Sequence, residues 1–192
     1  MKIVVVIDMQ NDFIDGALGS PEARAIVPVM VERLKELDSS ENLLLFTKDT
    51  HQTNYSETQE GKNLPVEHCV EDTHGWSINK EISSFCDYGS HFMGYSSHSV
   101  RKSRILKPTF GSIELADIIR DISYDKNYNI EEVILMGVCT DICVVSNALL
   151  LKAYCPEIPI TVDASCCAGV TPESHAAALT TMKMCQVNVI NE

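Results

Sequence analysis

Short apolar runs alternate with helical patterns along almost the whole chain, and this alternation restricts the fold more than any other feature. The expected strands cover residues 2–7, 43–47, 104–107, 133–136, 158–162 and 186–190, and the expected helices cover residues 21–37, 112–122, 141–153 and 172–184. Such alternation builds βαβ units and a parallel sheet that helices cover on both faces. We therefore predict an α/β three-layer sandwich with a mostly parallel central sheet, in a single domain over residues 1–192.

The first expected helix contains a proline. Ser20 is a suitable N-cap, and Pro21 fits the first helical position. Pro28 then interrupts the pattern, because a proline inside a helix removes a backbone hydrogen bond. We expect a helix that is kinked at Pro28, or one that begins only near Val27.

The segment Gly137-Val138-Cys139-Thr140-Asp141-Ile142-Cys143-Val144 joins a buried strand pattern to an apolar helical stretch. A cysteine at such a helix start lies among free backbone N–H groups and at the positive end of the helix dipole. Both favour the thiolate, which is the nucleophilic form. The same N–H groups can hold an oxyanion when the sulfur attacks a carbonyl. Cys143 is therefore a candidate nucleophile.

Asp8, Lys107 and Cys143 each lie at the end of an expected strand or just beyond it. In parallel α/β sheets, ligands bind outside the carboxyl ends of the strands. A carboxylate that takes a proton and an ammonium that holds negative charge can serve a nucleophilic cysteine without a histidine. Each residue alone is more simply explained as core packing or as a solvated charge. The ordered set of three favours catalysis.

Three motifs resemble those of the isochorismatase-like cysteine hydrolases, which include nicotinamidases and N-carbamoylsarcosine amidohydrolase. They are Asp8-Met9-Gln10-Asn11-Asp12-Phe13, Lys107 followed by the aromatic Phe110, and the segment from Gly137 to Val144, and the likeness spans nearly the whole chain. The resemblance implies a catalytic triad of Asp8, Lys107 and Cys143. It also implies a cis peptide bond at Val138–Cys139 that orients N–H groups toward the oxyanion, and a homo-oligomer.

The polar segment of residues 48–95 is long and irregular, which is typical of a functional loop. Asp49 and His51 lie two residues apart at its start, and Glu60 and His68 follow. These side chains are suitable ligands for zinc, iron or manganese. The resemblance to nicotinamidases implies that Asp49, His51 and His68, with Glu60 as a further ligand, bind a metal that holds the pyridine nitrogen of the substrate. The alternative is that the two histidines are hydrogen-bonded loop residues or direct substrate contacts.

Two aromatic side chains are candidate walls for a flat substrate. The resemblance implies that Phe13 lines the pocket, whereas Trp76 is a candidate only by its residue type. Partial burial against the polar segment is the simpler expectation for Trp76. Thr50 stands where the familiar nicotinamidase pattern has a tryptophan, so this loop departs from that pattern.

Charge and composition limit the partners and the location. The chain has 27 acidic and 15 basic residues and a net charge of −12, which argues against nucleic acid or an anionic membrane as partner. No apolar run reaches the length of a membrane span, and the apolar start is too short for a signal peptide, so we expect a cytoplasmic protein. The eight cysteines are expected to be reduced, with Cys143, Cys155 and Cys185 in or near the core.

The expected activity is hydrolysis of a small amide C–N bond through a thioester, with nicotinamide as the first candidate substrate. We expect one divalent metal, zinc first, and no organic cofactor. Cys143 favours acyl chemistry over the vinyl-ether cleavage known in the superfamily, where the nucleophilic cysteine is absent. Two alternatives stay open: a metal-free hydrolase of another small amide or carbamoyl compound, and a non-catalytic thiol-based binding or redox-sensing protein. A sensor would not need both Asp8 and Lys107.

Overall fold

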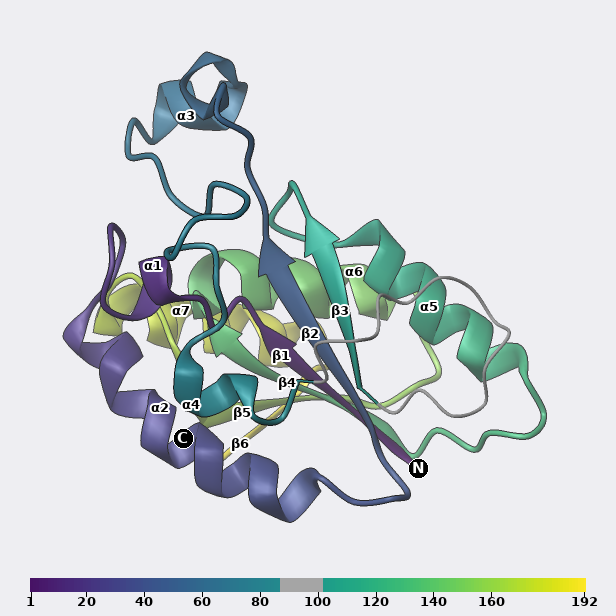
Figure 1. The fold of residues 1–192 in the computed structure, drawn as a ribbon. Coiled ribbons are helices and arrows are strands. Elements are labelled where there is room, and N and C mark those ends of the chain that lie inside the picture. Colours follow the sequence, from purple (N-terminus) through teal and green to yellow (C-terminus); the bar gives the residue numbers. More distant parts are fainter. Residues whose placement is uncertain (87–101) are drawn as a thin grey trace.

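Six parallel strands form one central sheet in the computed structural model, which describes residues 1–86 and 102–192 (Figure 1). The order across the sheet is β3-β2-β1-β4-β5-β6. The strands are β1 (Lys2–Ile7), β2 (Leu43–Asp49), β3 (Lys102–Lys107), β4 (Glu132–Val138), β5 (Ile160–Ala168) and β6 (Asn188–Ile190). The predicted α/β class is confirmed. The last part of the expected polar segment, residues 87–95, lies outside the described residues.

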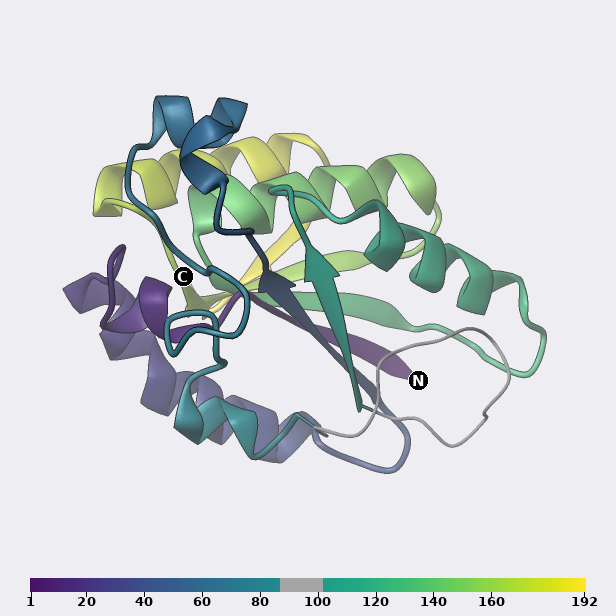
Figure 2. The ribbon, with the colours of Figure 1, turned by 45° about the horizontal axis from the view of Figure 1, so that its top comes forward.

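Helices cover both faces of the sheet (Figure 2). One face carries α1 (Asn11–Ile14), α2 (Pro21–Leu37) and α4 (Lys80–Ser83), and the other carries α5 (Ile113–Tyr124), α6 (Val145–Tyr154) and α7 (Pro172–Met184). Two short elements, η1 (Tyr55–Glu57) and α3 (Gln59–Asn63), stand beyond the carboxyl end of β2 (Figure 1). None of the helices in the described ranges is long and apolar enough to cross a membrane.

Helix α2 begins at the predicted cap and continues through Pro28. Ser20 Oγ accepts a backbone N–H of the first turn at 3.0 Å, and Pro21 is the first helical residue. The expectation of a start near residue 27 is therefore wrong. A proline inside a helix costs about 3 kcal/mol. Met30 and Leu34 are fully buried, and burial of each side chain contributes about 1.5–3 kcal/mol, which offsets that cost.

Several elements differ in length from the sequence-based expectation near the carboxyl edge of the sheet. Strand β4 ends at Val138 instead of residue 136, β5 ends at Ala168 instead of residue 162, and the expected helix 141–153 opens as a π-helical turn, η2 (Thr140–Val144). Asp163 is the first residue beyond the expected end of β5. Its side chain is fully buried and lies 3.1 Å from Arg33 Nε of α2, so this charge is paired and the strand continues.

No disulfide joins any of the eight cysteines, all of which lie in the described part of the chain. Cys143 and Cys155 are buried, as predicted. Cys185 is exposed because it lies at the C-cap of α7, beyond the part of the helix that packs on the sheet. Its predicted place in or near the core is therefore wrong.

Candidate active site

The register of the sheet brings the candidate residues to one edge. Ile7 of β1 pairs with Gly137 of β4, and Asp49 of β2 pairs with Lys107 of β3. Gly137 has a φ of 133°, and a Cβ there would lie 2.1 Å from the carbonyl oxygen of Ile7. Only glycine permits this close approach of β4 to β1. As a result Asp8, which follows β1, lies beside the segment that leaves β4.

The side chains of Asp8, Lys107 and Cys143 meet in the interior. Lys107 Nζ lies 2.6 Å from Asp8 Oδ2 and 3.5 Å from Cys143 Sγ. Thr47 Oγ1 donates to Asp8 Oδ1 at 2.7 Å, and Lys107 Nζ donates to the Thr109 carbonyl oxygen at 3.1 Å. The three candidate side chains are all buried. The structure therefore brings together an acid, a cation and a thiol that are shielded from water.

Burial governs the ionisation of this cluster. It raises the pKa of the Cys143 thiol well above its ordinary value, and the charge of Asp8 adds to this while Lys107 opposes it. Burial also raises the pKa of Asp8, against the effect of Lys107. Burial acts to lower the pKa of Lys107, but the charges of Asp8, Cys143 and Asp49 raise it overall. Lys107 stays cationic and the resting Cys143 is a thiol. The sequence analysis predicted a thiolate at Cys143, and this prediction is wrong for the resting protein. A base must therefore remove the thiol proton before the sulfur can attack.

Hydrogen bonds hold the segment that carries the thiol. The peptide bond between Val138 and Cys139 is cis, as the resemblance implies. Asn147, which is fully buried, donates from Nδ2 to the carbonyl oxygens of Cys143 at 2.8 Å and Phe110 at 3.1 Å. Its Oδ1 accepts a backbone N–H just before α5 at 2.9 Å. Asn147 thus joins the thiol-bearing turn to the loop after β3, a role that the sequence analysis missed.

A second connection joins this turn to the start of α7. His175 Nδ1 lies 2.8 Å from Thr140 Oγ1, and the Asp141 carboxylate accepts the Val170 N–H at 3.1 and 3.3 Å. Burial lowers the pKa of His175, which favours its neutral form. The sequence analysis missed His175 because only the fold brings it beside Thr140.

Asp49, His51, Glu60 and His68 direct their ligand atoms into one space, with all four atoms within 4.8 Å of one another. Asp49 Oδ2 lies 3.1 Å from His51 Nε2 and 3.4 Å from His68 Nε2. Glu60 Oε1 lies 3.5 and 3.7 Å from the same two nitrogens. Imidazole nitrogens with carboxylate oxygens fit a divalent metal such as zinc, iron or manganese.

Neighbouring groups orient these ligands. His68 Nδ1 lies 2.8 Å from the Val66 carbonyl oxygen, which makes Nδ1 the donor and leaves Nε2 free to bind a metal. Gln10 is fully buried and holds the backbone of Asp49 on both sides. Its Oε1 accepts the Asp49 N–H at 2.7 Å, and its Nε2 donates to the Asp49 carbonyl oxygen at 2.8 Å. The sequence showed Gln10 only as part of a motif.

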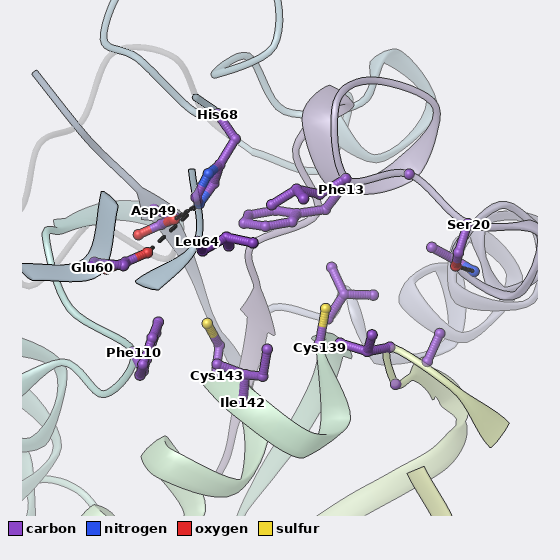
Figure 3. Close-up of a pocket in the computed structure, with 17 residues that line it drawn as sticks. Phe13, Ser20, Asp49, Glu60, Leu64, His68, Phe110, Cys139, Ile142 and Cys143 are labelled. Atoms are coloured by element: carbon purple, nitrogen blue, oxygen red, sulfur yellow. Dashed lines mark hydrogen bonds and ion pairs between the residues drawn. The ribbon is translucent and has the colours of Figure 1, made fainter. Parts of the chain in front are cut away.

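A cavity of about 330 Å³ connects the thiol to the ligand cluster (Figure 3). Phe13 lines it, with its ring edge-on to the His68 ring at 5.5 Å between centroids. Trp76 lies elsewhere: its Nε1 donates to Thr50 Oγ1 at 2.9 Å, and Lys48 Nζ lies over its ring. Partial burial against the polar segment, the simpler expectation, describes Trp76.

Comparison with known proteins agrees with this arrangement. Residues 2–192 match the isochorismatase domain family. The uncharacterized isochorismatase family protein PncA of Bacillus subtilis (strain 168) is 29% identical over 182 residues, which are 93% of this chain and 92% of that protein. The solved structure of a pyrazinamidase/nicotinamidase from Streptococcus mutans UA159 has a TM-score of 0.78 and 25% identity, over 99% of this chain and 100% of that chain.

A likeness at lower identity supports the fold alone. The pyrazinamidase of Pyrococcus horikoshii, solved in complex with zinc, has a TM-score of 0.75 and 24% identity, over 100% of this chain and 99% of that chain. Fold and family together define a hydrolase built on a parallel α/β sheet. The chain belongs to the isochorismatase family. Within it, the chain is an amidohydrolase of the nicotinamidase-related branch.

Proposed function

We propose that this protein hydrolyses a small aromatic amide of the nicotinamide type to a carboxylate and ammonia. The observation that carries the proposal is one cavity that holds both the Cys143 thiol and the ligand atoms of Asp49, Glu60 and His68 (Figure 3). The pyrazinamidase/nicotinamidase name of the Streptococcus mutans protein, at 25% identity, supports the same substrate class.

In the first half of the reaction, Cys143 attacks the amide carbonyl. Its proton moves to Asp8, whose carboxylate and the thiol contact the same Lys107 Nζ, at 2.6 and 3.5 Å. The raised pKa of Asp8 makes it a better base than an ordinary carboxylate. Lys107 Nζ, 3.5 Å from Sγ, stabilises the negative charge that remains on sulfur. Backbone N–H groups of Cys139 and Cys143 bind the oxyanion.

The second half releases the acid. Protonated Asp8 gives its proton to the amide nitrogen as the C–N bond breaks, so ammonia leaves and a thioester forms on Cys143. Water then attacks the thioester carbonyl while Asp8 accepts a proton from it. When the C–S bond breaks, that proton returns to sulfur, and the thiol and the carboxylate of Asp8 are restored.

Asp49, His51, Glu60 and His68 would hold one divalent metal. The orientation of His68 Nε2 by the Val66 carbonyl fits this role, and zinc is our first choice, as in the Pyrococcus horikoshii complex. When bound, the metal supplies a Lewis-acid contact for a ring nitrogen of the substrate. Cytoplasmic location and self-association stay predictions from the sequence.

The two alternatives have weaker support. The first is a metal-free hydrolase of another small amide or carbamoyl compound, which would not require the converging ligand atoms of Asp49, His51, Glu60 and His68. No arginine or lysine is among the described residues that line the cavity, so a substrate with a carboxylate would also lack a cationic partner there. The second alternative, a thiol sensor, would not require the close contact of Lys107 Nζ with Asp8 Oδ2, which lie 2.6 Å apart. An amide without a second charge suits this cavity better than either.

Ammonia release from nicotinamide, with metal content read on the same sample, tests the proposal. Cys143→Ser should lower the rate by at least about 10³-fold, because the nucleophile is lost. Cys155→Ser is the matched control, since Cys155 is also 5% exposed but lies outside the cavity. A Cys143→Ser protein that keeps most of the wild-type rate contradicts the mechanism.

Metal removal tests the ligand set separately. Dialysis against a chelator should abolish activity, and added zinc should restore it. His51→Gln should lower the zinc content well below one per chain, whereas His74→Gln, outside the cluster, should not. Full activity of the metal-free protein contradicts the metal site and favours a metal-free amidase. Absence of ammonia release from the zinc-loaded wild type overturns nicotinamide as substrate.

A further inference from the structure

The cavity beside Cys143 has two ends of opposite character. Asp49, Glu60 and His68 form the polar end. The other end, which we call the apolar arm, contains Ser20 and Cys139 (Figure 3). We assign to it the cavity-lining residues that are neighbours of these two in the chain or in the sheet, namely Leu18, Ala23, Ala168 and Val170. Figure 3 shows Cys139 between Cys143 and Ser20, on the side away from the polar end. The thiol therefore lies between a ligand cluster and an apolar recess.

The apolar arm offers no charge to a ligand. None of its described side chains is ionised at neutral pH, because burial raises the pKa of the Cys139 thiol to about 12. The Ser20 hydroxyl accepts a backbone N–H of α2 at 3.0 Å, so it already has a partner. Such a recess favours apolar groups and disfavours charged ones. Val170, which is 57% exposed, lies where the arm reaches the surface.

The size of the cavity exceeds the need of a primary amide with one ring. At about 330 Å³ it lies at the lower end of the range of pockets for drug-sized ligands, about 300–1,000 Å³. An acyl ring that reaches from the thiol to the polar end leaves the apolar arm empty when the leaving group is ammonia. The nitrogen substituent of an amide points away from the acyl group, and hence toward this arm.

We infer that the site accepts secondary amides, in which the leaving nitrogen carries a small uncharged alkyl group that fills the apolar arm. The inference rests on the proposed function, which places the acyl ring at the polar end. The bonds that form and break are the same as for the primary amide. Cys143 sulfur bonds to the carbonyl carbon and the C–N bond breaks. Asp8 protonates the nitrogen, and a primary amine leaves. Water then releases the acid from the thioester.

The test compares nicotinamide with its N-methyl, N-ethyl and N-propyl derivatives, with release of ammonia or amine as the readout. These three derivatives have similar intrinsic reactivity, so their ratios report on the arm. We expect kcat/KM to rise about fourfold for each added methylene, the factor that burial of one methylene provides. Val170→Trp should remove that rise by filling the arm. Val29→Trp, at an exposed valine of α2 outside the cavity, should preserve it.

Two outcomes would overturn the inference alone, and a third would overturn the proposed function as well. If the protein releases ammonia from nicotinamide but kcat/KM falls from the N-methyl to the N-propyl amide, the inference about the apolar arm is wrong. The proposed function then still stands. The same holds if Val170→Trp and Val29→Trp give equal ratios. No product from any of the four amides overturns both proposals.

Discussion

Gln10 holds the backbone of a candidate metal ligand on both sides, and Gln10→Met tests how much this support contributes. Its amide accepts the Asp49 N–H at 2.7 Å and donates to the carbonyl oxygens of Asp49 at 2.8 Å and Trp76 at 2.9 Å. Gln10 is fully buried and Asp49 is 4% exposed, so water does not replace the lost bonds. Methionine has a similar volume, so the change removes hydrogen bonds without opening a large cavity.

The magnitude follows from the groups that lose their partner. Both backbone groups of Asp49 become unsatisfied in the interior, and each such group costs about 1–3 kcal/mol. We therefore expect the free energy of unfolding to fall by about 2–6 kcal/mol, a large share of the roughly 5–15 kcal/mol of a whole domain. Loss of this support should also weaken zinc binding by about 10- to 100-fold.

Urea unfolding followed by circular dichroism measures the stability, and competition with a chromophoric chelator measures the zinc affinity. Gln52→Met is the matched control, because Gln52 is exposed and donates to Glu71 Oε2 at 2.7 Å on the surface. We expect that variant to stay within about 0.5 kcal/mol of the wild type. Wild-type stability and zinc affinity in Gln10→Met would refute the reasoning.

Three further substitutions, at Arg33, Gly137 and His175, give separate predictions. Arg33→Met leaves the fully buried carboxylate of Asp163 without its cation at 3.1 Å, and urea unfolding should show a loss of about 3 kcal/mol. Gly137→Ala places a Cβ 2.1 Å from the Ile7 carbonyl oxygen, so we expect no cooperative unfolding transition. Burial lowers the pKa of His175, so its contribution to stability is present above pH 6.5 and is lost as pH falls through the folded-state pKa. The stability difference between wild type and His175→Asn should shrink from pH 7.5 to pH 5.5.

Matched variants keep these predictions specific. Lys35→Met breaks an exposed pair with Glu32 and should change stability by less than about 1 kcal/mol. Gly111→Ala meets no atom closer than 3.5 Å and should fold normally. Equal effects of the Arg33 and Lys35 changes, normal folding of Gly137→Ala, or a pH-independent difference for His175→Asn would each contradict its prediction.

Local signals in the sequence determined the class of fold and the edge of the sheet that carries the candidate catalytic residues. Apolar periodicity separates strands from helices because each element buries one side of its own repeat. Ser20 marks a helix start because a cap binds backbone within its own turn. In a parallel sheet the strand ends share one edge, so Asp8, Lys107 and Cys143 were predicted to be neighbours before any distance was known.

The tertiary structure alone decided how these groups are held and in which protonation state. Gln10 reaches a residue 39 positions away, and Arg33 pairs with a carboxylate 130 positions away. A pattern of neighbouring residues does not specify such contacts, because they depend on how strands and helices pack together. The dipole argument suggested a thiolate at Cys143, but burial beside Asp8 raises the thiol pKa. Desolvation is set by every atom that surrounds a group in space, and chain order does not reveal those atoms.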